Sequence, residues 1–225
     1  MGSSTINARL SAVTKRIQDA CQRAGRNPAE VQLVAVTKTL PAETIQAAIQ
    51  AGLNVFGENY IQEARTKIKE IDSSVSWHFI GHLQSNKAKY AVELFDLIHS
   101  VDSLKLAREL DKRAGMIGRR IPILIQVNVS EEESKSGVNK ASAAKLVEEV
   151  SKLPNLDVRG LMTMPPFFDQ PERARPYFAL LREIKESIGP PLTELSMGMS
   201  GDFEVAIEEG ATIIRVGTAI FGPRA

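Results

Sequence analysis

Lys38 combines a reactive side chain with a position at which that reactivity could be used. It ends the run Val31–Lys38, whose β-branched residues are typical of a buried strand, and the residues that follow begin a helical pattern. An amine at the end of a buried strand is partly desolvated, which lowers its pKa and prepares it to form a Schiff base with a carbonyl compound. Taken alone, however, Lys38 is better explained as a lysine whose aliphatic stem covers a strand end.

Two runs near the end of the sequence carry glycines and hydroxyls in a pattern that suits an anion. They are Ser196–Asp202 and Arg215–Gly222. Their glycines would let the backbone approach a phosphate, and the hydroxyls of Ser200 and Thr218 could add hydrogen-bond donors. The first run is equally well explained as a plain turn in which Asp202 caps the following helix.

Short apolar runs alternate with amphipathic stretches along almost the whole chain, which predicts alternating strands and helices. The predicted strands are 31–38, 54–59, 76–82, 97–102, 121–130, 156–164, 194–198 and 213–217. The predicted helices between them are 42–51, 60–71, 86–94, 104–114, 141–153, 174–188 and 203–209. A further helix precedes them all, and its apolar face is formed by Ile6, Leu10, Val13, Ile17 and Cys21.

Eight strands, each except the last followed by a helix, predict an α/β fold with a closed (β/α)8 TIM barrel and one additional N-terminal helix. The main alternative is an open doubly wound sheet, which would place a Gly-x-Gly-x-x-Gly turn after its first strand. The turn that begins at Lys38 has no glycine, so the barrel is preferred. No linker divides the chain, and we predict one domain over residues 1–225, with a loose segment at residues 1–5.

The predicted barrel brings the reactive residues together. Its strands end at a common rim, and closure makes the eighth strand a neighbour of the first, so Lys38 lies next to the candidate anion site. The loops after the seventh and eighth strands are a frequent phosphate site in such barrels. Arg215 has the same strand parity as Gly217 and would point inward one layer deeper, where a buried cation needs an acceptor. A heteroaromatic ring nitrogen or the carboxylate of Glu58 could serve.

A ligand with a phosphate, an aldehyde and a ring nitrogen would satisfy these three groups, and pyridoxal 5′-phosphate (PLP) has all of them. The chain resembles the pyridoxal phosphate homeostasis proteins (the YggS/PROSC family), which are similar to the N-terminal barrel domain of alanine racemase. The resemblance extends from the first helix to Phe221. It rests on five motifs, of which the third is specific: Ala35–Lys38, Phe56–Tyr60, Trp77–Lys87, Ser196–Asp202 and Arg215–Gly222.

This resemblance implies a role for each candidate residue. It implies a Schiff base between PLP and Lys38, and phosphate contacts from Ser200, Gly217 and Thr218. It also implies that Arg215 faces the pyridine nitrogen, where a cation disfavours ring protonation and makes the cofactor a weaker electron sink. The predicted cofactor-binding set is completed by three further strand-end residues: Asn59, His82 and Met162.

Three functions are compatible with these residues. The resemblance implies an intracellular protein of vitamin B6 homeostasis and amino-acid and keto-acid balance, which holds PLP without catalytic turnover and could pass it to PLP-dependent apo-enzymes. A PLP-dependent amino-acid racemase is the alternative, but it needs a second base. Racemase relatives take that base, a tyrosine, from an added β-domain for which no sequence follows the eighth strand, although Tyr60 lies close enough to the rim to stay a candidate. The third function is a barrel for another phosphorylated metabolite, with Lys38 forming a Schiff base as in an aldolase.

Composition excludes several other classes of protein. The formal net charge of +1 gives no basic footprint for nucleic acid. Cys21 is the only cysteine, so no internal disulfide forms, and the three histidines lack the partners of a metal site. The chain has neither an apolar run that could cross a bilayer nor a signal peptide. We therefore predict a cytoplasmic protein, and a monomer because the β-domain that pairs the racemases is absent.

Overall fold

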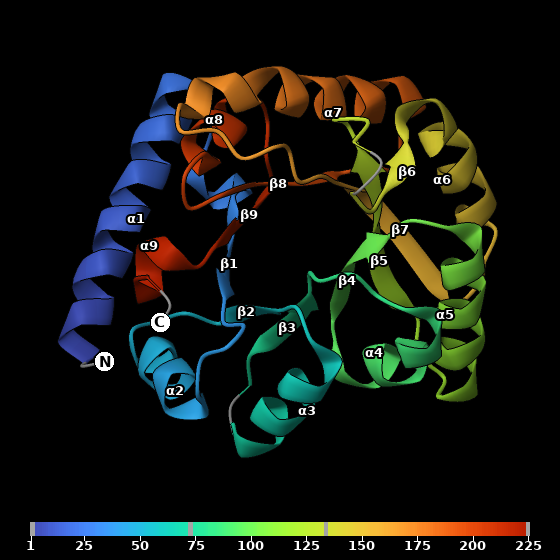
Figure 1. The fold of residues 1–225 in the computed structure, drawn as a ribbon, viewed down its shortest axis with the longest axis horizontal. Helices are drawn as coiled ribbons and strands as arrows, with labels where there is room; N and C mark the ends of the chain where they lie inside the picture. Colours follow the sequence, from blue (N-terminus) through green and yellow to red (C-terminus); the bar gives the residue numbers. More distant parts are fainter. Residues whose placement is uncertain (1–2, 72–73, 133–134, 224–225) are drawn as a thin grey trace.

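The computed structural model describes residues 3–71, 74–132 and 135–223 of the chain, and eight of the strands described there close into a parallel barrel (Figure 1). The order around the barrel is β1, β2, β3, β4, β5, β7, β8 and β9, with β9 pairing back to β1 and β4 pairing with β5. This confirms the predicted TIM barrel. The strands are β1 (Gln32–Val36), β2 (Val55–Glu58), β3 (Ser76–Phe79), β4 (Leu97–Val101), β5 (Ile121–Asn128), β7 (Leu156–Met162), β8 (Glu194–Met199) and β9 (Ile213–Val216).

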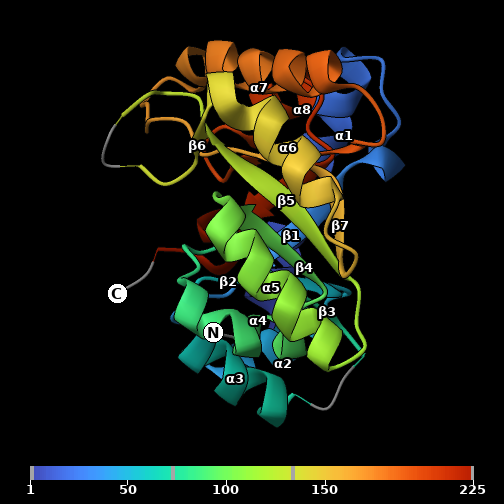
Figure 2. The same cartoon turned by 90° about the vertical axis from the view of Figure 1, so that its right-hand side faces the viewer.

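Helices cover the outside of the barrel, as the view from the side shows (Figure 2). They are α1 (Ser3–Arg23), α2 (Ala42–Gln50), α3 (Ile61–Glu70), α4 (Ala88–Leu94), α5 (Leu104–Met116), α6 (Ala143–Ser151), α7 (Arg175–Ile188), α8 (Phe203–Glu208) and α9 (Thr218–Phe221). Short 3-10 turns precede β1, α4, α6 and α7, at Pro28–Glu30, Ser85–Lys87, Lys140–Ser142 and Pro171–Ala174. Each helix turns an apolar face inward, which is why the helical periodicity predicted them.

The helix α1 takes the place of the long helix that would follow the last strand of a regular barrel. The helix after β9, α9, has only four residues, and α1 packs against α9, α8 and α2 (Figure 1). Its buried positions include Ile6, Val13, Ile17 and Cys21, as the sequence predicts. The seam between the last and first strands is therefore covered by the first helix of the chain.

Three short features differ from the prediction. The strand β6 (Val138–Asn139) pairs with β5, and the helix α9 follows β9, where no helix was expected. Both are too short for a periodic pattern to reveal. Residues 3–5, expected to be loose, belong to α1, whereas residues 1–2 lie outside the described part of the chain.

Apolar side chains fill the structure in two places. The larger core lies between the strands and the helices, and it includes Cys21 and Trp77. A smaller cluster fills the inside of the barrel, with one side chain from each of six strands: Val34, Val55, Leu97, Leu124, Met162 and Ile213. The barrel interior is thus a packed layer, and any ligand must bind above it. Within the described residues, no helix is long and apolar enough to cross a membrane.

Candidate functional site

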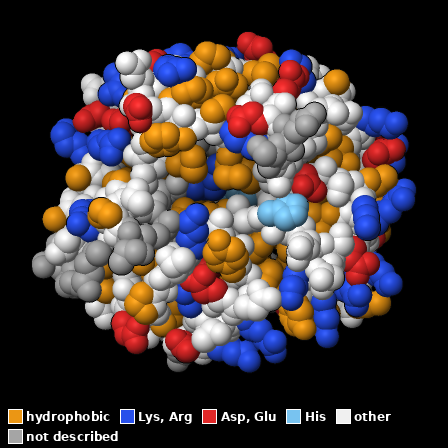
Figure 3. Space-filling model, viewed as in Figure 1, with side chains coloured by type: hydrophobic (Ala, Val, Ile, Leu, Met, Phe, Trp, Pro, Cys, Tyr) orange, Lys and Arg blue, Asp and Glu red, His pale blue; other side chains and the backbone are white. Residues whose placement is uncertain are grey.

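A pocket of about 280 Å³ opens at the carboxyl ends of the strands. The space-filling view shows a hollow at the centre of one face, with basic side chains in and beside it and hydrophobic side chains around it (Figure 3). Fourteen residues line the pocket: Val36, Lys38, Asn59, Ile80, Met164, Phe167, Phe168, Met199, Ser200, Gly201, Asp202, Arg215, Gly217 and Thr218. Six of the eight predicted cofactor-binding residues are among them.

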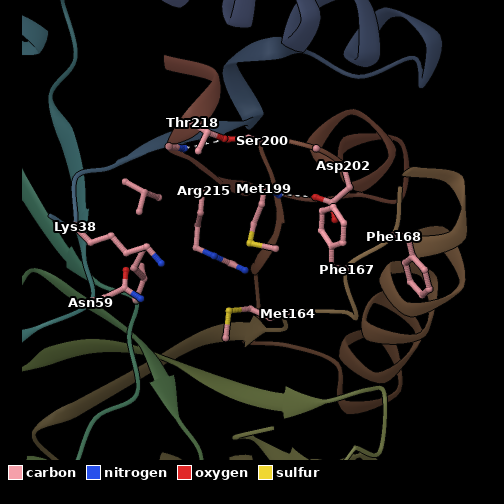
Figure 4. Close-up of a pocket in the computed structure, with 14 residues that line it drawn as sticks. Lys38, Asn59, Met164, Phe167, Phe168, Met199, Ser200, Asp202, Arg215 and Thr218 are labelled. Atoms are coloured by element: carbon pink, nitrogen blue, oxygen red, sulfur yellow. Dashed lines mark hydrogen bonds between the residues drawn. The ribbon is translucent and has the colours of Figure 1, made fainter. Parts of the chain in front are cut away.

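Lys38 enters the pocket from the end of β1 (Figure 4). The residues on either side of it are held by the neighbouring strand and by α3. Thr37 N donates to Gly57 O at 3.0 Å, and Lys67 Nζ donates to Thr37 O at 2.6 Å. On the other side, Thr39 N donates to Glu63 Oε1 at 2.5 Å, and Thr39 has a positive φ of 64°. The backbone of Lys38 is therefore fixed at both ends.

The groups that fix this backbone form an ionic cluster in which Glu58 and Lys67 are buried and Glu63 is half-buried. Lys67 Nζ bonds Glu58 Oε1 at 2.8 Å and also bonds Glu63, while Thr37 Oγ1 donates to the same Glu58 oxygen at 2.6 Å. Glu58 is completely buried, and burial raises the pKa of its carboxyl even though the Lys67 ammonium opposes the shift. We call Glu58, Glu63 and Lys67 the α3 clamp. Both bonds go to Oε1 of Glu58, and Arg215 bonds Ser196 and Thr163 instead, so Glu58 is not the acceptor for Arg215 that the sequence left open.

Ser200 ties the loop after β8 to the start of α9. Its Oγ accepts hydrogen bonds from the backbone of Gly217 at 3.2 Å and of Ala219 at 3.3 Å (Figure 4). Thr218 is exposed at the mouth of the same wall. The two glycine-containing runs of the sequence thus meet across β8 and β9 and form one polar wall of the pocket, which we call the Ser200 wall.

Asp202 has a different role from the helix cap that the sequence allowed. It stands at the N-cap position of α8, but its carboxylate accepts from Met199 N at 2.6 Å and makes no capping hydrogen bond to the helix. The bond closes the tight turn after Gly198, whose φ of +90° favours glycine. Burial raises the pKa of the Asp202 carboxyl.

Arg215 forms the floor of the pocket. It is 3% exposed, and its guanidinium donates from Nη1 to Ser196 Oγ at 2.5 Å and from Nη2 to Thr163 O at 2.8 Å. Both partners are neutral. Burial lowers the pKa of the guanidinium to about 10, against the attraction of Asp202, so it stays a cation at neutral pH. A cation without a directly bonded carboxylate at the bottom of a pocket favours an electron-rich ligand atom.

Asn59 brings an unused hydrogen-bond acceptor to the pocket. Within the described part of the chain, its Oδ1 is buried and has no hydrogen-bond partner. Its backbone is covered by Gly81, at which an added Cβ would lie 2.2 Å from Asn59 O. Glycine at 81 is therefore required for β3 and β2 to approach each other here. A buried orphan acceptor is costly unless a ligand donates to it.

Two predicted residues, His82 and Met162, do not line the pocket. The side chain of His82 is 59% exposed, and its Nδ1 lies 3.1 Å from Ser136 Oγ. The strand β3 ends at Phe79, so the alternation that would aim His82 inward is lost, and Ile80 reaches the pocket instead. Met162 is fully buried in the barrel interior, one layer too deep. Of the other polar strand-end residues, Asp102, Asn128, Ser130, Thr163 and Ser196 also lie outside the lining.

The loop after β7 supplies pocket residues that the sequence analysis did not select. Met164, Phe167 and Phe168 form an apolar wall opposite Lys38, and Phe167 is 84% exposed (Figure 4). Met164 has the same parity as Met162, so the strand alternation contained the signal. The wall gives the pocket one apolar side for a flat ring. The Ser200 wall and two cations give it polar sides suited to an anion.

The model of the alanine racemase N-terminal domain family matches residues 8–225 of the chain. A relative from Aquifex aeolicus, named Pyridoxal phosphate homeostasis protein, is 48% identical over 221 residues, which are 96% of this chain and 97% of that protein. A relative of the same name from Pseudomonas aeruginosa is 47% identical over 222 residues, 98% of this chain and 96% of that protein.

Solved structures show the same architecture. The structure of PipY from Synechococcus elongatus with PLP bound has a TM-score of 0.84 and 40% identity, and the match covers 96% of this chain and all of PipY. Alanine racemase from Corynebacterium glutamicum has a TM-score of 0.71 at 17% identity, covering 96% of this chain and 62% of the racemase. The second likeness concerns the fold alone.

Proposed function

The chain belongs to the pyridoxal phosphate homeostasis proteins, a group within the alanine racemase N-terminal domain family, and from this membership we propose that it binds PLP in the pocket at the end of its barrel. The relatives' name and the PLP bound to PipY support the ligand. The observation that carries the proposal is the position of the Lys38 amine in one pocket with the Arg215 cation and the Ser200 wall. Together they match an aldehyde, a ring nitrogen and a phosphate.

The residues present fit this group. Lys38 would hold the aldehyde carbon as a Schiff base, and Ser200, Gly217 and Thr218 would hold the phosphate. Arg215 would face the ring nitrogen, and Asn59, whose Oδ1 lacks a partner among the described residues, would accept from a polar substituent. Once bound, PLP would supply an electrophilic carbon and a conjugated ring able to withdraw electrons. His82 and Met162 are not included, because neither reaches the pocket.

The α3 clamp and the apolar wall would support this binding. The clamp fixes the residues on both sides of Lys38, so the amine is presented with little loss of backbone entropy. Met164 and Phe167 would cover the ring and exclude water from the bond to Lys38. Arg215 keeps a positive charge at the floor, which disfavours a second positive charge on a ring nitrogen facing it.

We propose further that the protein stores and hands on the cofactor, with no catalytic turnover. Racemisation needs a second base, and the ionisable residues in the described pocket lining are Lys38, Asp202 and Arg215. Asp202 is bonded to Met199 N. Tyr60 is 57% exposed and does not line the pocket. A role in cytoplasmic vitamin B6 homeostasis, a monomeric state and transfer to apo-enzymes are part of this proposal.

An absorption spectrum tests the binding step. After incubation with PLP and gel filtration, the protein is expected to keep a visible band of lysine-bound pyridoxal, which borohydride removes and fixes to the chain. Lys38→Ala is expected to lack the band yet retain weak affinity for PLP, because the Ser200 wall is unchanged. Peptide mapping of the reduced sample identifies the modified lysine. A wild-type protein that stays colourless at millimolar PLP would overturn the proposal.

Deuterium exchange separates storage from catalysis. The loaded protein is incubated with L-alanine in deuterated water, and the α-hydrogen is followed by proton NMR. Storage predicts no exchange above that of free PLP, whereas a racemase would exchange the α-hydrogen and invert the centre. Catalytic exchange that Lys38→Ala abolishes would favour the racemase and overturn storage without turnover.

A further inference from the structure

A chain of hydrogen bonds crosses the inside of the barrel beneath the pocket. Arg215 Nη1 donates to Ser196 Oγ, and Ser196 Oγ lies 2.8 Å from His99 Nδ1. His99 Nε2 lies 3.0 Å from His78 Nδ1, and the two rings are tilted at 47° with centroids 5.1 Å apart. All four side chains are buried. The chain joins β9 and β8 to β4 and β3, on the other side of the barrel.

The chain also joins the two ends of the barrel. Arg215 lines the pocket at the carboxyl ends of the strands. His78 lines a second cavity, of about 360 Å³, whose other walls come from the amino-terminal ends of the strands and the loops before them. Asp96 and Arg159 face His78 there, and Glu194 lies on the same wall. Each of the three intervening contacts has hydrogen-bond geometry.

The contacts fix the direction of the chain. Ser196 Oγ accepts from Arg215, so its own proton needs an acceptor, and His99 Nδ1 is the partner within reach among the described residues. His99 then carries its proton on Nε2 and donates it to His78 Nδ1. His78 in turn carries its proton on Nε2. In the opposite direction His99 would donate to Ser196, and the buried hydroxyl proton would find no acceptor in the described part of the protein.

Both histidines are held neutral. Burial is the main cause that lowers the pKa of His78 to about 4, and burial with the charge of Arg215 and the neighbouring ring lowers the pKa of His99 well below its usual value. The hydrogen-bond chain therefore gives the Arg215 guanidinium an acceptor without placing a negative charge beside it. Three polar side chains in an apolar barrel would be costly if they only filled space. Oriented in one direction, they polarise one another and strengthen the bond to the guanidinium.

We propose that Ser196, His99 and His78 are positioning residues for Arg215: they hold its guanidinium at the pocket floor as a cation whose hydrogen-bond partners, Ser196 Oγ and Thr163 O, are both neutral. This inference rests on the proposed function for the identity of the ligand, but its first test does not need a ligand.

Nitrogen-15 NMR of the PLP-free protein tests the direction of the chain. At pH 7, His78 and His99 are expected to be neutral and to carry the proton on Nε2, as read from the ring nitrogen shifts. The exposed His82 serves as an internal reference for a histidine outside the chain. Ser196→Ala is expected to change the signals of His99 more than those of His82. A proton on Nδ1 of His99, or a charged ring at pH 7, would overturn the inference.

Variants of the loaded protein test the effect on the pocket. Ser196→Ala and His99→Leu are each expected to weaken PLP binding roughly tenfold, because a hydrogen bond to a charged group is lost or left without its partner. They are also expected to move the pH transition of the bound chromophore upward by about one unit, since a poorly held cation opposes ring protonation less. His99→Gln should restore much of the PLP affinity and bring the pH transition back toward the wild-type value, because its amide offers one acceptor and one donor.

The control is Leu124→Val, which disturbs the same barrel interior without touching the chain. It is expected to lower thermal stability but to keep the pH transition of the chromophore. The inference fails if Leu124→Val and His99→Leu shift the transition equally, or if Ser196→Ala shifts nothing. If wild-type protein binds no PLP, the proposed function fails, while the NMR experiment still tests the chain by itself.

Discussion

Single residues at this site are constrained by backbone contact as much as by chemistry. Gly81 is the clearest case, because its Cα faces the backbone of Asn59, and an added Cβ would meet Asn59 O at 2.2 Å. Asn59 could not keep its place in the pocket beside a larger residue. This explains a glycine that no ligand need touch.

Gly81→Ala is therefore expected to destabilise the fold by roughly 2 to 3 kcal/mol, as an overpacked backbone contact does. Urea unfolding followed by circular dichroism gives the value. Gly201→Ala is the matched comparison, since an added Cβ there meets nothing within 4 Å, and its stability should stay within about 0.5 kcal/mol of wild type. Equal losses in the two variants would contradict the explanation.

The α3 clamp shows how one helix controls a neighbouring strand end. Lys67 is 5% exposed and bonds two carboxylates and the carbonyl of Thr37, so it neutralises Glu58 and holds the chain before Lys38 in the same contact. Removing one partner of a buried ion pair costs more than removing both.

Lys67→Met is expected to destabilise the protein by about 3 to 5 kcal/mol, because it leaves the Glu58 charge buried without its cation. The double variant with Glu58→Gln should recover part of this loss. PLP uptake by the single variant should also slow, since Thr37 O loses its donor. Lys152→Met removes an exposed lysine paired with Glu148 and should leave unfolding unchanged. A double variant less stable than the single variant would contradict this account.

The sequence predicted elements well where a periodic pattern was long enough. All eight barrel strands and seven helices after the first one were located from alternation and helical spacing. The four-residue α9 was not predicted, and neither was the hydrogen bond from Ala219 N, in this helix, to Ser200 Oγ. Strand parity also identified Arg215 as inward-facing, but it could not say how far each strand extends. That is why the prediction placed Met162, and not Met164, at the pocket, and why it also placed His82 there.

Side-chain partners were beyond the sequence for a different reason. Glu58 and an aromatic nitrogen were equal candidates for Arg215, because both strands end at the same rim. Only the structure shows that Arg215 bonds Ser196 and Thr163, whereas Glu58 bonds Lys67 from α3. The contact between His78 and His99 was likewise hidden, since they lie on separate strands and no local pattern links them.

At the scale of the whole molecule, the two buried histidines make stability depend on pH. Their folded pKa values lie below the unfolded value of about 6.5, at about 4 for His78 and well below 6.5 for His99. Below pH 6.5 these histidines therefore bind protons in the unfolded protein but not in the folded protein, and stability falls as the pH falls. Glu58 and Asp202, whose folded pKa values are raised, act in the opposite direction.

His99→Gln is expected to make the loss of stability between pH 6.5 and 5 shallower by up to about 1.4 kcal/mol per pH unit, the contribution of one proton. Urea unfolding at a series of pH values measures the slope. Comparing variant with wild type cancels the carboxyl contribution. Leu124→Val, which removes no titratable group from the barrel interior, should keep the wild-type slope. An unchanged slope in His99→Gln would show that His99 takes up protons equally in both states.

The substitution of α1 for a long final helix also sets an order of events during synthesis. As the chain leaves the ribosome, α1 emerges before the barrel strands and α2 soon follows it, but α8 and α9, the two other helices against which α1 packs, emerge after most of the strands. Lys38 likewise emerges long before the Ser200 wall, which lies across the seam between β1 and β9. The part of the apolar face of α1 that α8 and α9 cover therefore stays exposed until these helices have formed. The newly synthesised protein can bind its ligand only after β9 has been made.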